Sequence, residues 1–397
     1  MRTAQHVVVY PNDKSRLISG GTRSGNLKIL AYRKYLEFIG LCLLAGVFFW
    51  WFGRKLNWAE VREAVSHSNP YLLLAAASIV SLSYVVRAFR WGALLRPLVS
   101  SRFGDLFAAT TVGFGTVFLI GRAGEVVRPV VLPMRDERVR PSAAIVTIMV
   151  ERIYDMMAVV LMFAINLIWF KAPPSLQKDF TKVRAVGIGL LVGTILGIVL
   201  LTWFRKNSTF VIAGFTKVFD RLDFIPRRIS KLAISILEQL ARALRVLVNV
   251  AELAETITWT AVLWLGVALA NLLIIRAFGV TFGFSETIFV MGWSLAGSLV
   301  PTPGGAAGAF HAATAAGLIF LGVPPETAAA ISIVMHVIDF GPALLFGFFY
   351  IIRGDLSFSK LRALASPEAV EHVVEDEALL PDNANTKQQT LGGVLTD

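Results

Sequence analysis

The chain has 397 residues, of which 55% are hydrophobic and only 16% are charged, and its mean hydropathy is +0.65. This balance excludes an ordinary soluble domain and indicates a membrane protein. A single cysteine, Cys42, excludes a disulfide within the chain and a cysteine-based metal site. The formal net charge of +11 is typical of cytoplasmic loops that face anionic lipid; nucleic-acid binding is the competing interpretation, but the basic residues flank apolar segments.

The first elements are a basic arm and two spans. Residues 1–35 are polar and basic and lack the early apolar core of a signal peptide, so we expect a cytoplasmic arm. A first span at about 36–53 ends in an aromatic cluster that is typical of a membrane interface. A short amphipathic connector, 54–70, leads to a second span at about 71–95.

A broken apolar stretch follows at 104–134. The polar run 121–128 interrupts it, and the returning arm is too short to cross a bilayer, which favours a re-entrant hairpin packed within the protein. Further spans are predicted at about 142–170, 183–204 and 257–279.

The last part of the chain contains a second hairpin. A basic linker, 205–255, carries apolar residues at helical spacing, so we expect a surface helix on the anionic leaflet. The second hairpin covers about 285–322, with an elbow at 301–305, and a last span occupies about 327–352. The acidic tail, 354–397, is predicted to be largely disordered.

The membrane part consists of two similar halves, at about 71–170 and 257–352. With a shift of 184 residues, Gly113 falls on Gly297, Gly121 on Gly305, Gly124 on Gly308, Pro141 on Pro325 and Asp155 on Asp339. Just upstream, with a slightly different shift, Val-Arg-Ala-Phe at 86–89 meets Ile-Arg-Ala-Phe at 275–278. Helix breaks at matching places predict a transporter whose site lies between the halves.

The distribution of basic residues predicts the topology. We expect a protein of the inner (plasma) membrane with six crossings, two non-crossing hairpins and both termini in the cytoplasm. This topology places every basic segment on the cytoplasmic side. The two halves are then inverted relative to each other. The sequence therefore predicts an all-α polytopic membrane fold of about six spanning helices plus two hairpins, or eight spans if both hairpins cross.

Charged residues near the first hairpin form one candidate substrate-binding cluster. Burying a charge in a bilayer costs at least about 2–3 kcal/mol, so buried charges tend to be paired and functional. We expect the cluster to bind polar headgroups; the alternative is a salt-bridge cluster that only fixes the hairpin. Its members are Arg122, Glu125, Arg128, Glu151, Arg152 and Asp155.

The second hairpin and the last span hold the other candidates. Prolines stop the first arm, and glycines allow an elbow that exposes backbone N–H groups to an anion; the alternative is a turn that merely packs. Two histidines and an aspartate follow, and either histidine could act as a pH-sensitive switch or only as a packing residue. These candidates are Pro303, Gly304, Gly305, Gly308, His311, His336 and Asp339.

Enzyme templates are absent from the sequence. There is no zinc-protease HExxH, Walker loop, GxSxG or DxD motif, and no nucleophile or metal set accompanies Glu151 and Asp155. We therefore expect neither an enzyme nor a cofactor or metal.

The motifs together resemble the lysylphosphatidylglycerol synthase transmembrane-region family of flippase-like membrane proteins. The resemblance rests on Gly-Arg-Ala-Gly-Glu-Val-Val-Arg-Pro at 121–129, Glu-Arg-Ile-Tyr-Asp at 151–155, Arg-Ala-Phe-Arg-Trp at 87–91 and Pro-Thr-Pro-Gly-Gly at 301–305. It spans about residues 36–353 and implies a bundle that moves lipids or lipid-linked molecules between leaflets. We expect no counterpart of the synthase domain that the best-known members carry. His311 and His336 stand where the family usually has a Glu and an Arg.

The sequence thus predicts a membrane lipid flippase whose partners are anionic phospholipids or lipid-linked molecules. One alternative is a membrane transferase acting on a polyprenyl- or phospholipid-linked substrate. Another is an accessory scaffold of an envelope-lipid enzyme.

Overall fold

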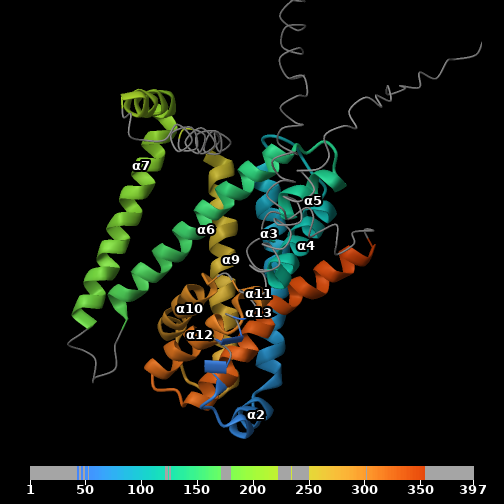
Figure 1. Cartoon of the computed structure of the whole chain (residues 1–397), viewed down its shortest axis with the longest axis vertical. Helices are drawn as coiled ribbons and strands as arrows, with labels where there is room; N and C mark the ends of the chain where they lie inside the picture. The colour runs from blue at the N-terminus through green and yellow to red at the C-terminus, as the bar shows by residue number, and fades with distance from the viewer. Residues whose placement is uncertain are drawn as a thin grey trace, which may run out of the picture.

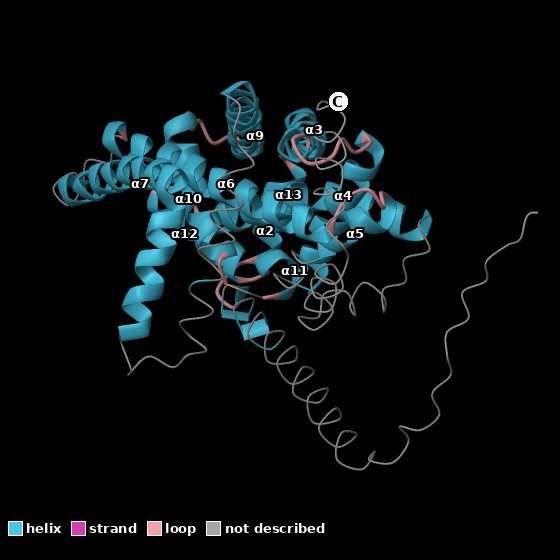
Figure 2. Ribbon diagram, turned by 90° about the horizontal axis from the view of Figure 1, so that it is seen from above, coloured by secondary structure: helices cyan, strands magenta, loops and turns pink. Residues whose placement is uncertain are grey.

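The computed structural model describes residues 43, 46–47, 50–51, 53–120, 124, 127–170, 180–221, 234, 250–300 and 302–353. This described part contains eleven helices. Figure 1 labels them, and Figure 2 shows helices and loops but no strand among the described residues. The helices are α2 (Trp58–Ser66), α3 (Pro70–Leu95), α4 (Phe103–Ile120), α5 (Val127–Arg135), α6 (Pro141–Trp169), α7 (Phe180–Arg221), α9 (Val250–Ala277), α10 (Phe284–Ser298), α11 (Pro303–Ala306), α12 (Ala309–Phe320) and α13 (Pro325–Arg353). The predicted arm, the tail and most of the predicted first span lie outside the described residues.

In the part of the chain that the structure describes, three helices, α3, α9 and α13, are long and apolar enough to cross a membrane. Large apolar side chains such as Leu265 on α9 and Leu345 on α13 are 61% and 74% exposed, as expected for surfaces that face lipid. The start of α3 is fixed locally. The Asn69 side chain accepts hydrogen bonds from the backbone N–H groups of Tyr71 and Leu72, and Pro70 occupies the first helical position.

The helices α3 and α9 pack side by side and run antiparallel. The Asn69 N–H at the start of α3 donates to the Ala277 carbonyl at the end of α9, at 2.8 Å. At the other end of the pair, Arg96 bonds Glu255 at 2.9 Å. The two Arg-Ala-Phe motifs, which lie at the C-terminal ends of these helices, are therefore at opposite ends of the domain.

Both predicted hairpins are broken helices. The helix α5 has nine residues, about 13 Å, so it is too short to span a hydrocarbon core of roughly 30 Å. The second hairpin is built from α10, α11 and α12, of which the two long arms have 15 and 12 residues. Figure 1 shows α4 and α5 in the upper half of the domain and α10 and α12 in the lower half. Each hairpin also packs on the long helix of the other half, α4 on α13 and α10 on α6.

Glycines at matching positions allow the arms of each hairpin to touch. A Cβ at Gly113 would lie 2.8 Å from Arg128 Cβ, and a Cβ at Gly297 would lie 2.6 Å from the Ala309 carbonyl oxygen. Real Cβ contacts are not this short, so any larger residue must separate the arms.

Gly113→Ala should therefore lower stability by about 1–3 kcal/mol, the usual cost of overpacking, and should move Arg128. Thermal unfolding in detergent measures the loss. Gly104→Ala is the matched control, because a Cβ there meets nothing within 4 Å and Gly104 lies in the same helix. Equal melting temperatures of the two variants would contradict the close approach at Gly113.

The helices α7 and α9 extend beyond the spans predicted for them. The helix α7 continues beyond the predicted span and bends at Asn207, whose φ of −118° is not helical. The helix α9 begins at Val250, seven residues before the predicted span at 257. Hydropathy falls toward the end of this helix, where Glu252 lies in its first turn, but the helical backbone continues to Val250. Of the predicted surface helix, 222–233 and 235–249 lie outside the described residues.

Candidate functional site

Arg90 lies at the centre of a buried ion cluster between α3 and α6. Its side chain is completely buried, and its two terminal nitrogens bond the Asp155 carboxylate at 2.6 and 3.1 Å. The same guanidinium lies 3.0 Å from Glu151 Oε1. Glu151 and Asp155 are one turn apart on α6, so a single arginine from α3 reaches both.

Arg128 of α5 joins this cluster from the first hairpin. Its guanidinium makes a two-pronged bond with Glu151, at 2.7 and 2.9 Å, and lies over the Trp91 ring at 4.2 Å from the ring centre. The Trp91 indole in turn donates to Thr147 Oγ1 at 3.0 Å. The short arm α5 is therefore held to α3 and α6 by a charge pair and an aromatic face.

The helix α9 of the second half completes the cluster. Trp264 Nε1 donates to Asp155 Oδ1 at 3.0 Å, and Arg90 donates to Thr260 Oγ1 at 3.3 Å. Asp155 thus binds side chains from both halves of the domain.

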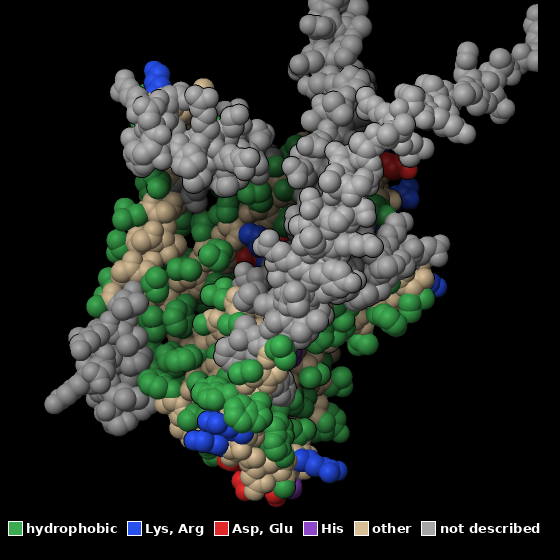
Figure 3. All heavy atoms as spheres, in the orientation of Figure 1, with side chains coloured by type: hydrophobic (Ala, Val, Ile, Leu, Met, Phe, Trp, Pro, Cys, Tyr) green, Lys and Arg blue, Asp and Glu red, His purple; other side chains and the backbone are tan. Residues whose placement is uncertain are grey.

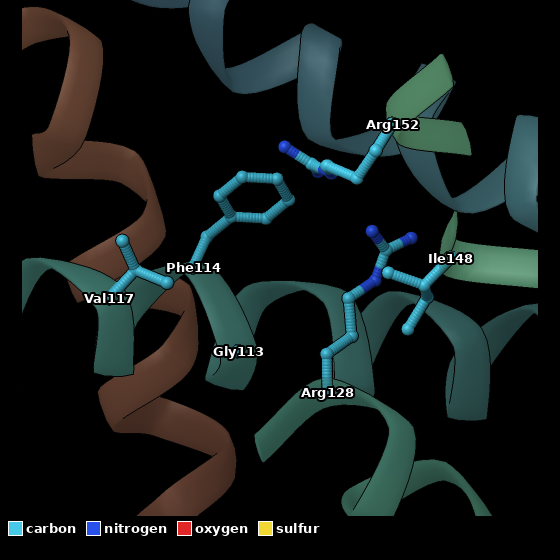
Figure 4. A pocket seen from close by; sticks show the side chains of 6 residues that line it. All are labelled: Gly113, Phe114, Val117, Arg128, Ile148 and Arg152. Carbon is cyan, nitrogen blue, oxygen red and sulfur yellow. The ribbon is translucent and has the colours of Figure 1, made fainter. Parts of the chain in front are cut away.

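Arg152 is the exposed member of the cluster. Its side chain is 39% exposed, and its contacts with Glu151 and Asp155 are long, at 3.4 and 3.9 Å. It lines a small cavity of about 20 Å³ together with Gly113, Phe114, Val117, Arg128 and Ile148. Figure 4 shows Arg128 and Arg152 pointing from different elements toward the space beside the Phe114 ring.

Arg87 approaches the same ring from α3. Its guanidinium lies 4.8 Å from the Phe114 ring centre and 5.9 Å from that of Tyr84. Arg128 and Arg152 lie 5.7 and 5.8 Å from the Phe114 ring centre, so three guanidiniums surround one phenyl group. Among the described residues Arg87 has no ion pair within 4.0 Å, although Asp155 and Asp339 lie within electrostatic reach.

Unused donors remain in this cluster. The Nε–H groups of all four arginines are buried and have no hydrogen-bond partner within the described part of the chain; they belong to Arg87, Arg90, Arg128 and Arg152. Buried donors are normally satisfied by protein, water or a ligand. These four Nε–H groups are therefore free to donate to a water molecule or to a ligand.

The elbow of the second hairpin is a left-handed turn. Gly304, Gly305 and Ala306 have φ values of 75°, 64° and 65°. Glycine adopts this conformation without cost, whereas Ala306 is strained there. The Gly308 N–H at the start of α12 donates to His311 Nδ1 at 3.1 Å. At least one of the backbone donors expected to meet an anion is thus bound by the helix's own side chain.

The two predicted histidines lie together below this elbow. Their ring centres are 4.6 Å apart, and both are buried. His336 Nε2 bonds the Gly305 carbonyl at 3.1 Å, and no ion pair joins it to Asp339. Phe118, Phe310 and Phe340 pack around His336. A role in proton sensing stays a prediction, whereas a packing and capping role is visible.

The structure thus brings together four of the six residues predicted for the first cluster. Arg122 and Glu125 lie outside the described residues. The predicted site omitted Arg87 and Arg90, which are as central as the predicted members. The signal was present, because both are charged residues in the second half of an otherwise apolar span. Thr260 and Trp264 carry no such signal.

The family described as the lysylphosphatidylglycerol synthase TM region matches residues 38–347. That range contains every described member of both clusters and confirms the resemblance seen in the motifs. No curated protein matches the chain. The chain belongs to the lysylphosphatidylglycerol synthase transmembrane-region family.

Proposed function

We propose that this membrane protein is a lipid flippase, which moves a phospholipid or lipid-linked molecule between the leaflets. The observation that carries the proposal is the set of three guanidiniums around Phe114. Among the described residues, Arg90, Arg128 and Arg152 share two carboxylates, Glu151 and Asp155. The fourth arginine, Arg87, makes no ion pair within 4.0 Å there, although Asp339 lies within electrostatic reach. Spare positive charge at membrane depth is costly, and an anionic headgroup offsets that cost.

The chemistry suits a phosphate-bearing headgroup. Arginine presents a planar fork that bonds two phosphate oxygens at once, and Arg87 and Arg152 are the members least occupied by carboxylates. The cavity holds little more than a water molecule. Arg152, which is partly exposed and weakly held, would swing aside as the headgroup enters while the acyl chains stay in lipid.

An inverted repeat would give such a site access to both leaflets in turn. Three features support this arrangement: the antiparallel packing of α3 and α9, the close contacts at Gly113 and Gly297, and the packing of each hairpin on the long helix of the other half. Pro141 and Pro325 begin these long helices, and Asp155 and Asp339 follow at equal distances.

We further propose an inner-membrane location with cytoplasmic termini, six crossings and two re-entrant hairpins. The turn between α5 and α6 is then cytoplasmic, and α2 is outside. In a Cys42→Ser background, Glu137→Cys should react with an impermeant maleimide only after permeabilisation, and Arg62→Cys should react in intact cells. Both residues are exposed. Labelling of position 137 in intact cells would contradict the re-entrant first hairpin.

Transport in a purified system tests the function itself. The full chain is reconstituted in vesicles that carry a fluorescent phosphatidylglycerol, and dithionite quenching reports the fraction that reaches the outer leaflet. The expected result is faster exchange than in protein-free vesicles. Unchanged exchange would contradict the proposal and favour the scaffold alternative. A covalently changed headgroup in the recovered lipid would instead favour the transferase.

A further inference from the structure

A second cavity lies at the other end of the domain from the arginine cluster. It has a volume of about 240 Å³, and it opens between the segment before α2 and one face of α12. Figure 1 shows α2 at the lower end of the domain, opposite α4 and α5. Trp51, Arg54, Lys55, Leu56, Ala312, Ala315, Ala316, Ile319 and Pro325 line the cavity.

The two sides of the cavity differ in polarity. Arg54 and Lys55 provide two adjacent cations, whereas the α12 side consists of alanines and Ile319. No ion pair within 4.0 Å neutralises either cation in the described part of the chain, and Arg54 instead lies over the Trp50 ring at 4.9 Å. Glu326, next to Pro325, is the acidic group nearest in sequence to the lining residues and pairs with neither cation.

Neighbouring aromatic residues place the cationic end at headgroup level. Trp50, Trp51 and Trp58 are all exposed, and exposed tryptophans mark the membrane interface. Figure 3 shows charged side chains gathered at the lower end of the molecule, below a broad hydrophobic surface. From Ile319 to Ala312 the lining follows α12 for two turns, about 10 Å.

The cationic segment is also held in place. The Arg54 N–H donates to the Trp50 carbonyl at 2.9 Å, and the Leu56 N–H donates to the Gly53 carbonyl at 3.2 Å. Leu56 packs against the core cluster that includes Ala329 and Ala330 of α13. The two charges therefore stand on a fixed turn rather than on a free loop.

We propose that this cavity is a binding site for an anionic phospholipid, distinct from the arginine cluster. Arg54 and Lys55 bind the phosphate headgroup, and the first part of an acyl chain lies along Ala312, Ala316 and Ile319. The two cations on one side, the apolar residues of α12 on the other and the position at headgroup level all match this one class of ligand. The proposal concerns binding alone and does not depend on transport.

Site-specific crosslinking tests it. The full chain carries p-benzoylphenylalanine in place of Ile319 and is reconstituted in equimolar phosphatidylglycerol and phosphatidylcholine. After illumination, mass spectrometry identifies the attached lipid. The expected adducts are enriched in phosphatidylglycerol, whereas the same probe in place of Leu265, on the lipid-facing side of α9, captures both lipids equally.

Charge variants complete the test. A cation near a membrane surface contributes about fivefold to anionic-lipid affinity, so Arg54→Gln with Lys55→Gln should reduce the enrichment by on the order of twentyfold. Arg62→Gln, an exposed cation at the same end that does not line the cavity, should leave it unchanged. Arg54→Lys with Lys55→Arg keeps the charge and should retain the enrichment. Equal capture of both lipids at position 319, or enrichment that survives the glutamine pair, would overturn the proposal.

Discussion

Glu151→Gln should destabilise the protein by about 3–5 kcal/mol, the cost of leaving a buried partner charge unpaired. Glu151 is completely buried, and its carboxylate forms ion pairs with both Arg90 and Arg128. Glutamine keeps the size of the side chain but removes its charge. Arg128 then has no carboxylate partner among the described residues, whereas Arg90 keeps its bonds to Asp155. Thermal and denaturant unfolding of the detergent-solubilised protein measure the loss.

Asp105→Asn is the matched control for Glu151→Gln. Asp105 also bonds an arginine, Arg135, at 3.0 Å, but both side chains are partly exposed. Exposed pairs contribute about 0–1 kcal/mol, so this variant should unfold almost as the wild type does. The double variant Arg128→Gln with Glu151→Gln should lose less than the sum of its single variants, because it removes a charge together with its partner. Additive losses would contradict the direct coupling of these two side chains.

Much of the helical framework could be predicted from local signals. The prolines at 141 and 325 begin the two long helices, because proline at the first helical position loses no intrahelical bond. The polar break near 121 separates α4 from α5, and the Pro-Gly-Gly run separates α10 from α12. These are properties of single residues, so one sequence is sufficient to read them.

Tertiary partners could not be predicted in the same way. Arg128 makes its two-pronged bond with Glu151, which lies 23 residues away in the sequence. The spacing of charges within one helix does not indicate which other helix packs against it. For the same reason, Trp264 and Thr260 could not be associated with Asp155 before α9 was placed beside α3.

The elbow at 301–308 illustrates a further limit. Its glycines predicted a tight turn, and three consecutive residues with positive φ form it. Their pattern did not reveal that His311 would accept the Gly308 N–H. A capping contact depends on how far a side chain reaches after the turn has formed. The same residues are therefore compatible with a helix terminus whose N–H groups are free and with one whose N–H groups are bound.

Arg87→Gln and Arg152→Gln should each slow lipid exchange by roughly tenfold or more, with less effect on stability than Glu151→Gln. Neither arginine has a close carboxylate contact in the described structure: the Arg152 contacts are 3.4 and 3.9 Å long, and Arg87 lies over aromatic rings. A hydrogen bond from a charged donor to a headgroup contributes about 1.5–3 kcal/mol, which corresponds to tenfold or more in rate or affinity. Dithionite quenching in reconstituted vesicles measures the exchange.

Two further variants separate headgroup binding from a general effect of charge. Arg87→Lys keeps the charge but loses the planar fork, so it should impair exchange nearly as much as glutamine does. Arg96→Gln is the matched control, since Arg96 follows the same helix and bonds Glu255 with a side chain that is 56% exposed. Its exchange should equal that of the wild type. Full exchange by folded Arg87→Gln and Arg152→Gln would assign these arginines to holding the hairpin and would remove the headgroup site from the cluster.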